Sequence, residues 1–280
     1  MPRLLLLIAC LLGLSFPLAA REQSDAPDAA IIGFSPDGRY FAYEEFAYEI
    51  VSDALVAAIY VVDRETNRMA DGFPFGVVAQ EIDGALPGKV GGFSPDPALL
   101  DTSNSDPDLP ALRKALREAA RPKLDALGIG TDGRRLAGVA MTQRSPAESR
   151  TTPLVFVTTP TILGSGIPDL QLSYALDVKQ EPEPADCYNV NPPARDKLLT
   201  FDVIATENYP ELKDVGRVTT TTSFRMEEGT CAMGLWVSDV LLPPGDGGTV
   251  AVLYLAAAWA SHTDVAGWHA VFVKLPDVRR

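Results

Sequence analysis

The sequence has 280 residues, of which 46% are hydrophobic and 22% are charged, and its formal net charge is −13 at pH 7. A chain of this length can bury roughly three quarters of its unfolded surface, so it needs no disulfide or metal to build a core. The negative charge repels phosphate backbones and anionic lipid head groups, which argues against nucleic acids and membrane surfaces as partners.

Residues 1–20 have the composition of a leader for export. Arg3 precedes an apolar stretch, and small residues close that stretch before the polar segment REQSDAPD. This order is typical of a cleaved secretory signal peptide. We therefore expect a periplasmic or secreted protein whose mature chain, residues 21–280, forms a single mainly-β domain. The alternatives are a permanent anchor, for which the apolar run is short, and lipidation at Cys10 within LIAC.

Short runs rich in β-branched and aromatic residues alternate with Gly, Pro, Asn and Asp along the rest of the chain, which indicates strands joined by turns. Because long crossover helices are missing, we expect antiparallel sheets, arranged as a sandwich or a partial propeller-like array. The longest apolar run, residues 249–260, fits a buried strand, and no membrane span is expected. The predicted strands are Ile31–Phe34, Tyr40–Glu45, Ala58–Val62, Phe75–Ile82, Arg135–Met141, Leu154–Thr158, Leu170–Val178, Leu198–Ala205, Val218–Phe224, Leu235–Leu241, Val250–Leu255 and His269–Lys274.

The stretch GFSPDGRYFAYEE predicts a tight reversal between the first two strands. Pro36 presets φ, Asp37 can bond its own backbone and Gly38 takes a positive φ, so these three are structural turn residues. Adjacent strand residues point to opposite faces, so Glu44 and Glu45 cannot share a substrate. The expected faces are Tyr40, Ala42 and Glu44 on one side, and Phe41, Tyr43 and Glu45 on the other.

One amphipathic helix is predicted at about residues 107–127. Its apolar residues recur at spacings of three and four, Gly128 follows its end, and Pro122 must kink or split it. Arg113, Arg117 and Arg121 line another face at i, i+4 and i+8. This basic ridge could bind an acidic partner. The alternatives are a solvated face, or pairing with the carboxylates of the protein itself.

Several motifs with possible chemistry have structural explanations. GIGTDG (residues 128–133) matches the dinucleotide-binding glycine pattern, but a helix precedes it and a strand follows. That order is the reverse of the one that binding requires, so we interpret it as a helix stop plus a hairpin turn. DTSNSDPD (residues 101–108) resembles a calcium loop but lacks the required glycine. His262 and Asp264 lack a third metal ligand. We predict no catalytic, cofactor-binding or metal-binding residues.

Two cysteines, Cys187 and Cys231, remain after removal of the leader. A pair of thiols in an exported protein predicts one disulfide, which would pin the proline-rich loop that carries Cys187. The alternative is two independent buried thiols.

The motifs taken together resemble a family of predicted secreted bacterial proteins known only as domain of unknown function 2259. The resemblance rests on the leader, GFSPDGRYFAYEE, IYVVD, the charged helix ending in LDALGIG, GTCAMGLWVSDV and AVLYLAAAW. It implies secretion and a Cys187–Cys231 pair, and it assigns no activity. The first hairpin is also similar to a blade hairpin of TolB-type β-propellers, although the repeat period of a closed propeller is missing.

These observations favour a non-enzymatic envelope protein that binds another protein or an envelope component, with Arg113, Arg117 and Arg121 as possible contacts. No cofactor is expected. The alternative is an envelope hydrolase that works through dispersed carboxylates.

Overall fold

The computed structural model describes residues 27–49, 54–80, 109–138, 154–158, 172–181, 195–207, 213–226, 230–245, 248–260 and 263–277. These residues form antiparallel sheets with one helix, as predicted, and the described strands close into neither a barrel nor a propeller. In these ranges, no helix is long and apolar enough to cross a membrane. The elements are β1 (Asp28–Phe34), β2 (Tyr40–Glu49), β3 (Ala54–Asp63), β4 (Arg68–Met69), β5 (Phe75–Gln80), α2 (Leu109–Ala126), β6 (Arg134–Gly138), β7 (Leu154–Val157), β8 (Leu172–Glu181), β9 (Arg195–Glu207), β10 (Lys213–Met226), β11 (Thr230–Leu242), β12 (Thr249–Ala260) and β13 (Thr263–Lys274).

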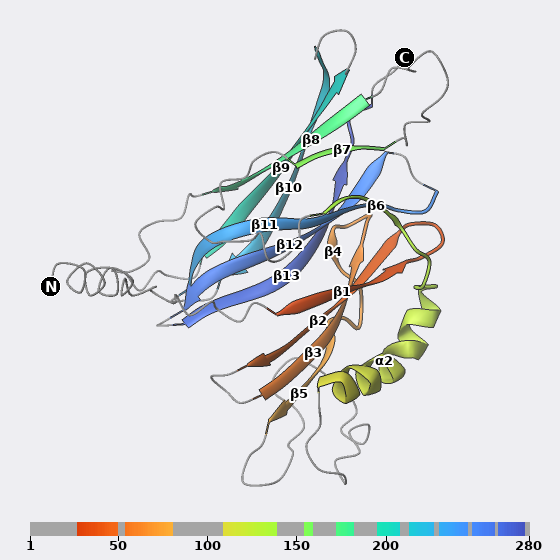
Figure 1. Cartoon of the computed structure of the whole chain (residues 1–280), viewed down its shortest axis with the longest axis vertical. Helices are drawn as coiled ribbons and strands as arrows, with labels where there is room; N and C mark the ends of the chain where they lie inside the picture. The colour runs from red at the N-terminus through yellow and green to blue at the C-terminus, as the bar shows by residue number, and fades with distance from the viewer. Residues whose placement is uncertain are drawn as a thin grey trace, which may run out of the picture.

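Three sheets lie in layers, and α2 covers the free face of the first (Figure 1). The helix-side sheet has the order β1-β2-β3-β4, and β5 also pairs with β3. The middle sheet has the order β13-β12-β11-β6, and the outer sheet has the order β10-β9-β8-β7. Most neighbours are therefore consecutive strands. The exceptions among the described strands are β5, which pairs with β3, and β6, which follows the helix and pairs with the distant β11.

The alternation of β2 places its residues on two faces, as predicted. Ala42 lies in the core beneath α2, whereas Phe41 and Tyr43 lie in the core between the helix-side and middle sheets. β2 pairs with β3 without a register shift from Tyr40↔Asp63 to Glu49↔Ala54, so the alternation is not interrupted. The two adjacent glutamates consequently serve different layers.

The middle sheet is buried on both faces, which explains the apolar run of β12. Val250, Val252 and Tyr254 pack against the outer sheet. Ala251, Leu253 and Leu255 pack against the helix-side sheet. A strand that is covered on both sides has no face for polar residues, so it becomes a continuous apolar run.

Helix α2 forms where its pattern predicts it. Leu112, Leu116, Ala120 and Leu124 are buried against the helix-side sheet. The helix ends in a Schellman motif: the Ile129 amide donates to the Leu124 carbonyl at 2.9 Å, and the Gly128 amide to the Asp125 carbonyl at 3.0 Å. Gly128 takes the left-handed conformation (φ 68°) that this motif needs. Pro122 lies inside the helix without ending it.

The segment after α2 corrects one prediction. Thr131 exchanges backbone hydrogen bonds with Phe34 at the end of β1, at 2.8 and 2.9 Å, and the chain then continues into β6. A Cβ on Gly133 would lie 2.2 Å from the Phe34 ring. The glycines thus let the chain cross closely over β1, and the predicted hairpin turn at this point is wrong.

Candidate functional site

Glu44 is the most completely buried charged residue of the described ranges, with none of its surface exposed. Because side chains alternate between the two faces of β2, the Glu44 side chain lies under α2, on the same face as Ala42 and Phe46. Burying a carboxylate costs several kcal/mol unless cations and hydrogen bonds compensate for the lost water. The helix above must therefore supply positive charge at this point.

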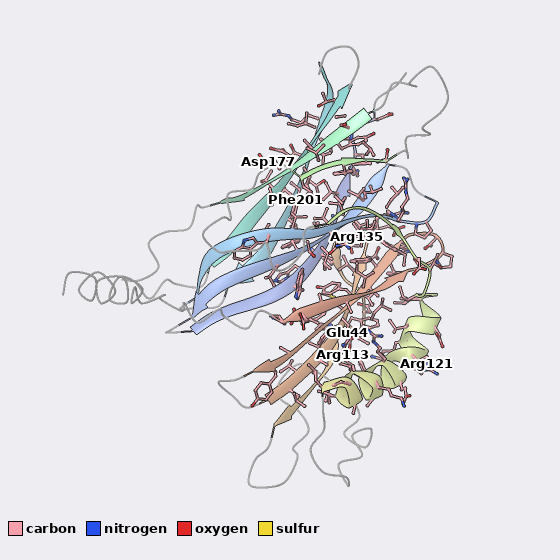
Figure 2. The ribbon with its side chains drawn as sticks, in the orientation of Figure 1. Glu44, Arg113, Arg121, Arg135, Asp177 and Phe201 are labelled. Atoms are coloured by element: carbon pink, nitrogen blue, oxygen red, sulfur yellow. The ribbon has the colours of Figure 1, made fainter. Side chains whose placement is uncertain are left out.

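Arg113 and Arg117, one turn apart on α2, provide that charge. Arg113 holds the carboxylate with two parallel hydrogen bonds, from Nε to Oε1 at 3.1 Å and from Nη2 to Oε2 at 3.0 Å. The Nε of Arg117 donates to Oε2 at 2.9 Å. Figure 2 shows Glu44 and Arg113 meeting in the seam between strand and helix. Such two-pronged bonds are among the stronger polar contacts in proteins.

Positive charge remains at the surface of this seam. Two guanidinium groups share one carboxylate, and 26% of the Arg113 side chain and 47% of the Arg117 side chain stay exposed. The Arg113 guanidinium also lies over the Phe46 ring, 3.4 Å from its centroid, which fixes its plane. The arginines are thus held in place by the carboxylate below them, while part of each side chain stays exposed.

Two further basic residues of α2 lie beside Arg113 and Arg117. Lys114 and Arg121 are exposed, and Figure 2 shows Arg121 on the outward side of the helix. We call Arg113, Lys114, Arg117 and Arg121 the basic face. Of the three predicted arginines, the structure therefore engages Arg113 and Arg117 with the protein's own carboxylate and leaves Arg121 exposed.

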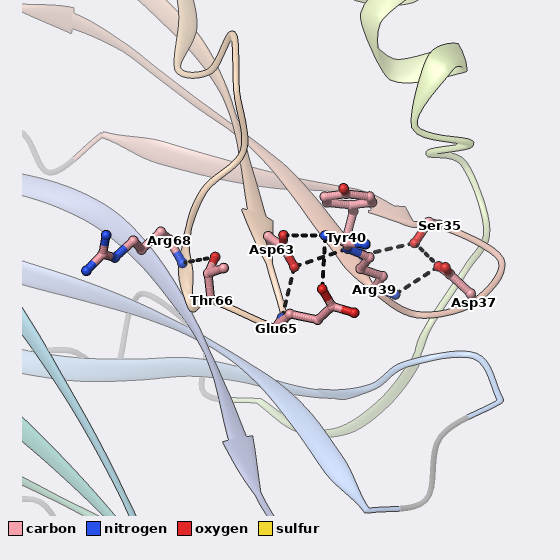
Figure 3. A network of polar contacts seen from close by, with 8 residues as sticks. All are labelled: Ser35, Asp37, Arg39, Tyr40, Asp63, Glu65, Thr66 and Arg68. Carbon is pink, nitrogen blue, oxygen red and sulfur yellow. Dashed lines mark hydrogen bonds and ion pairs between the residues drawn. The ribbon is translucent and has the colours of Figure 1, made fainter.

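Pro36, Asp37 and Gly38 form the turn that leads into β2 (Figure 3). The Ser35 hydroxyl donates to Asp37 Oδ1 at 2.6 Å, and the Arg39 amide donates to the same oxygen at 3.0 Å. These bonds, the Ser35 hydroxyl first, hold the pKa of Asp37 below its ordinary value. The Asp37 carboxylate is thus already hydrogen-bonded within its own turn.

Arg39 links this turn to the end of β3. Its Nη2 lies 2.9 Å from Asp63 Oδ2 and 3.1 Å from Glu65 Oε2. The hydrogen bonds from Arg39 are the main reason that the pKa of Asp63 lies below its ordinary value. The Glu65 amide also donates to Asp63 at 2.9 Å. This network connects neighbouring turns of the helix-side sheet.

Another buried carboxylate, Asp239, lies beside a β-bulge of β11, where the register with β12 shifts between Val237 and Asp239. Arg135 of β6 brings its Nε within 2.6 Å of Asp239 Oδ1. Ser238 donates to the other carboxylate oxygen. The contact ties the edge strand β6 to its neighbour β11 within the middle sheet.

The remaining chemical candidates do not assemble in the described ranges. His269 packs on Tyr254 in the core between the middle and outer sheets, and burial lowers its pKa to about 4. His262, Cys187 and residues 101–108 lie outside these ranges. Cys231 opposes Trp259 in the β11–β12 ladder. The described residues hold no group of three or more His, Cys, Asp or Glu side chains that could bind a metal ion.

Comparison of the chain with known protein families, with characterised proteins and with solved structures finds no match. The basic face and its buried anchor Glu44 are thus the best-defined candidate site.

The role of Glu44 was missed in the sequence. Its signal was present, because Glu44 shares the predicted strand face of Tyr40 and Ala42, and a carboxylate on such a face must either be exposed to solvent or be paired with a cation. A row of arginines on the only predicted helix was the obvious source of that cation.

Proposed function

We propose that this chain is an exported periplasmic or secreted protein that binds another protein or an envelope component without catalysing a reaction. The basic face of α2 is its contact surface. The observation that carries this proposal is a pair of arginines whose positions are fixed by a buried carboxylate while part of each side chain stays exposed.

The preferred ligand group is a carboxylate-rich segment of a partner protein. Guanidinium forks match the geometry of carboxylates, and pre-positioned arginines lose little conformational freedom on binding. A planar anionic membrane would face the whole chain with its net charge of −13, which opposes approach. A local acidic segment meets only the helix, because charges further away than about 8 Å are largely screened at physiological salt.

Lys114 and Arg121, the two basic-face residues that do not contact Glu44 in the described structure, are exposed and test this surface without disturbing the core. Lys114→Glu combined with Arg121→Glu reverses charge on the exposed part of the basic face. Arg68→Glu, on an exposed residue of β4, is the matched control with the same type of charge change. Tagged proteins are cross-linked to partners in the native envelope at two salt concentrations.

We expect the wild type and Arg68→Glu to capture the same partner, and the double variant to lose it. Raising the salt concentration should weaken capture, since the contact is electrostatic. Equal capture by the double variant would contradict the basic face as the contact. Turnover of ester, glycan or peptide substrates that disappears when one carboxylate is replaced would contradict the non-enzymatic role and favour a hydrolase.

Export, the disulfide and the family are parts of the same proposal with separate tests. N-terminal sequencing of protein from the native host should begin at Arg21, and a retained leader or lipidated Cys10 would overturn this localisation. Thiol treatment should change migration on a non-reducing gel if Cys187 and Cys231 are paired, and titration of two free thiols would exclude the pair. Membership of the domain of unknown function 2259 family stays a prediction.

A further inference from the structure

The chain contains five Asp-Gly sequences, at which a protein backbone can rearrange without an enzyme. Glycine has no Cβ that would hinder its amide nitrogen from attacking the carboxyl group of the preceding aspartate. Asp37–Gly38, Asp71–Gly72 and Asp132–Gly133 lie in the described ranges. Their surroundings differ, so the structure ranks their reactivity.

Asp37–Gly38 is restrained at both reacting groups. Asp37 Oδ1 accepts hydrogen bonds from the Ser35 hydroxyl at 2.6 Å and from the Arg39 amide at 3.0 Å. The Gly38 amide donates to the Ser35 carbonyl at 2.9 Å. These bonds must break before the Gly38 nitrogen can reach the Asp37 carboxyl carbon. At about 1 kcal/mol net for each bond, they should slow the reaction at least about ten-fold.

Asp132–Gly133 is restrained by packing. A Cβ on Gly133 would lie 2.2 Å from the Phe34 ring and 3.0 Å from the Leu242 carbonyl oxygen. Thr131, immediately before the pair, exchanges two backbone hydrogen bonds with Phe34. The backbone is thus fixed on both sides of Asp132, which opposes the rotation that the attack requires.

Asp71–Gly72 has neither restraint. The pair forms the two central residues of a β-turn between β4 and β5, and this turn is closed by the Phe73 amide, which donates to the Ala70 carbonyl at 3.1 Å. Asp71 and Gly72 are both exposed. Among the described contacts, neither the Asp71 carboxylate nor the Gly72 amide has a hydrogen-bond partner. Both reacting groups are therefore available.

We infer that Asp71–Gly72 is a site of spontaneous conversion to isoaspartate. The Gly72 nitrogen attacks Asp71 Cγ and forms a C–N bond, while the amide proton and the carboxyl hydroxyl leave as water. Water then opens the cyclic imide. Opening at Cγ restores aspartate, whereas opening at the main-chain carbonyl leaves Gly72 attached through Cγ. The product has the same mass and one more backbone atom, and solvent water is the only other reactant.

The additional backbone atom changes a contact with the helix. The Gly72 carbonyl accepts a hydrogen bond from Lys123 Nζ of α2 at 3.2 Å. Lengthening the turn displaces this carbonyl and breaks the bond between Phe73 and Ala70. In the isoaspartate form, the Phe73 amide should therefore exchange with solvent at least about ten-fold faster than in the unreacted protein.

The test is to incubate the purified full chain in water enriched in the heavy isotope of oxygen and to digest samples at intervals. Opening of the imide places the heavy oxygen on the residue that reacted, and resistance to a protease that cleaves before aspartate identifies isoaspartate. We expect both signals to accumulate at Asp71 at least about ten-fold faster than at Asp37, and to accumulate slowly at Asp132 as well. In concentrated urea the three pairs should react at similar rates, because the restraints of the fold are absent.

Two variants serve as matched controls. Asp71→Glu keeps the charge but needs a larger ring, so labelling at position 71 should fall to the background level and the Phe73 amide should stay protected. Ser35→Ala removes the hydroxyl that holds Asp37, so labelling should become faster at Asp37 and stay unchanged at Asp71.

Three results would overturn the inference. They are equal labelling of Asp71 and Asp37 in the folded protein, an excess at Asp71 that persists in urea, and an isoaspartate form in which the Phe73 amide exchanges at the original rate.

Discussion

Single polar residues in this protein hold layers together, and Glu44 is the clearest case. It lies at the centre of an otherwise apolar seam and binds two arginines of the covering helix. A buried charge of this kind adds little net stability compared with an apolar residue, but it becomes costly when its partners are left without it. The carboxylate therefore determines where along the sheet the helix can sit.

Glu44→Gln should lower the free energy of unfolding by about 2–3 kcal/mol. The amide is nearly the same size but carries no charge, so Arg113 and Arg117 lose their counter-ion. We place the cost below the full range for a buried pair, because both arginines are partly exposed. Urea unfolding measures it. Glu118→Gln, on an exposed residue of α2, is the control and should stay within about 0.5 kcal/mol of the wild type. If Glu44→Gln also changed the free energy of unfolding by less than about 0.5 kcal/mol, Glu44 would not be the residue that anchors α2 to the sheet.

Gly38 lies so close to Pro243 and Pro244 that adding a side chain should lower the stability of the protein. Gly38 and Gly245 share a positive φ, 66° and 71°. A Cβ on Gly38 would lie 2.8 Å from both Pro243 Cβ and the Pro244 carbonyl oxygen, whereas a Cβ on Gly245 would meet no atom of the described residues within 4 Å. Gly245→Ala should cost about 1 kcal/mol for the left-handed backbone alone. Gly38→Ala adds the clash and should cost about 2–4 kcal/mol. Thermal unfolding of both variants compares them, and equal costs would show that the turn can move away from the prolines.

At the scale of elements, local patterns predicted the strands and the helix but not their neighbours. The alternation of β2 gave the correct faces for Phe41 and Ala42, and the leucine spacing gave α2, since both depend on residues close in sequence. The pairing of β6 with β11 depends on residues about a hundred positions apart, and the sequence carries no local sign of it. β4 was missed because a strand of two residues, Arg68–Met69, has no period to detect.

Pro122 offers a prediction about the helix itself. It lies in α2 four residues after Glu118, so the Glu118 carbonyl lacks its usual donor, and the ring crowds the preceding turn. Because Pro122 is exposed, Pro122→Ala should restore the hydrogen bond without changing the core and should raise the free energy of unfolding by about 1–3 kcal/mol. Urea unfolding measures the gain. Lys114→Ala, an exposed substitution elsewhere on α2, should change stability by less than about 0.5 kcal/mol. A loss of stability would show that Pro122 shapes the end of the helix.

At the scale of the whole molecule, α2 and three sheets stack in layers, and two of the sheets are buried on both faces. The core beneath α2, the core between the helix-side and middle sheets, and the core between the middle and outer sheets follow one another through the fold. The outer sheet is packed on one face only, whereas the helix-side sheet, between α2 and the middle sheet, and the middle sheet itself are both apolar on two faces. A titratable group in one of these interlayer cores therefore reports on the packing of whole sheets.

His269 is such a group, since it lies between the middle and outer sheets against Tyr254. Burial lowers its pKa from 6.5 to about 4, so the unfolded chain binds more protons between these values. The free energy of unfolding should therefore fall as the pH drops from about 6.5 to 4, by up to about 3 kcal/mol. Urea unfolding over this range measures the slope.

His269→Gln isolates this contribution, because it removes the titrating ring while His262 stays in the chain. The variant should lose most of the dependence between pH 6.5 and 4. It should keep the further loss of stability at lower pH, where Asp63, whose pKa lies below its ordinary 3.8, takes up its proton and releases Arg39. If the wild type and the variant have the same slope above pH 4, the histidine is hydrated in the folded protein, and the contact between the middle and outer sheets is looser at this point than the packing on Tyr254 indicates.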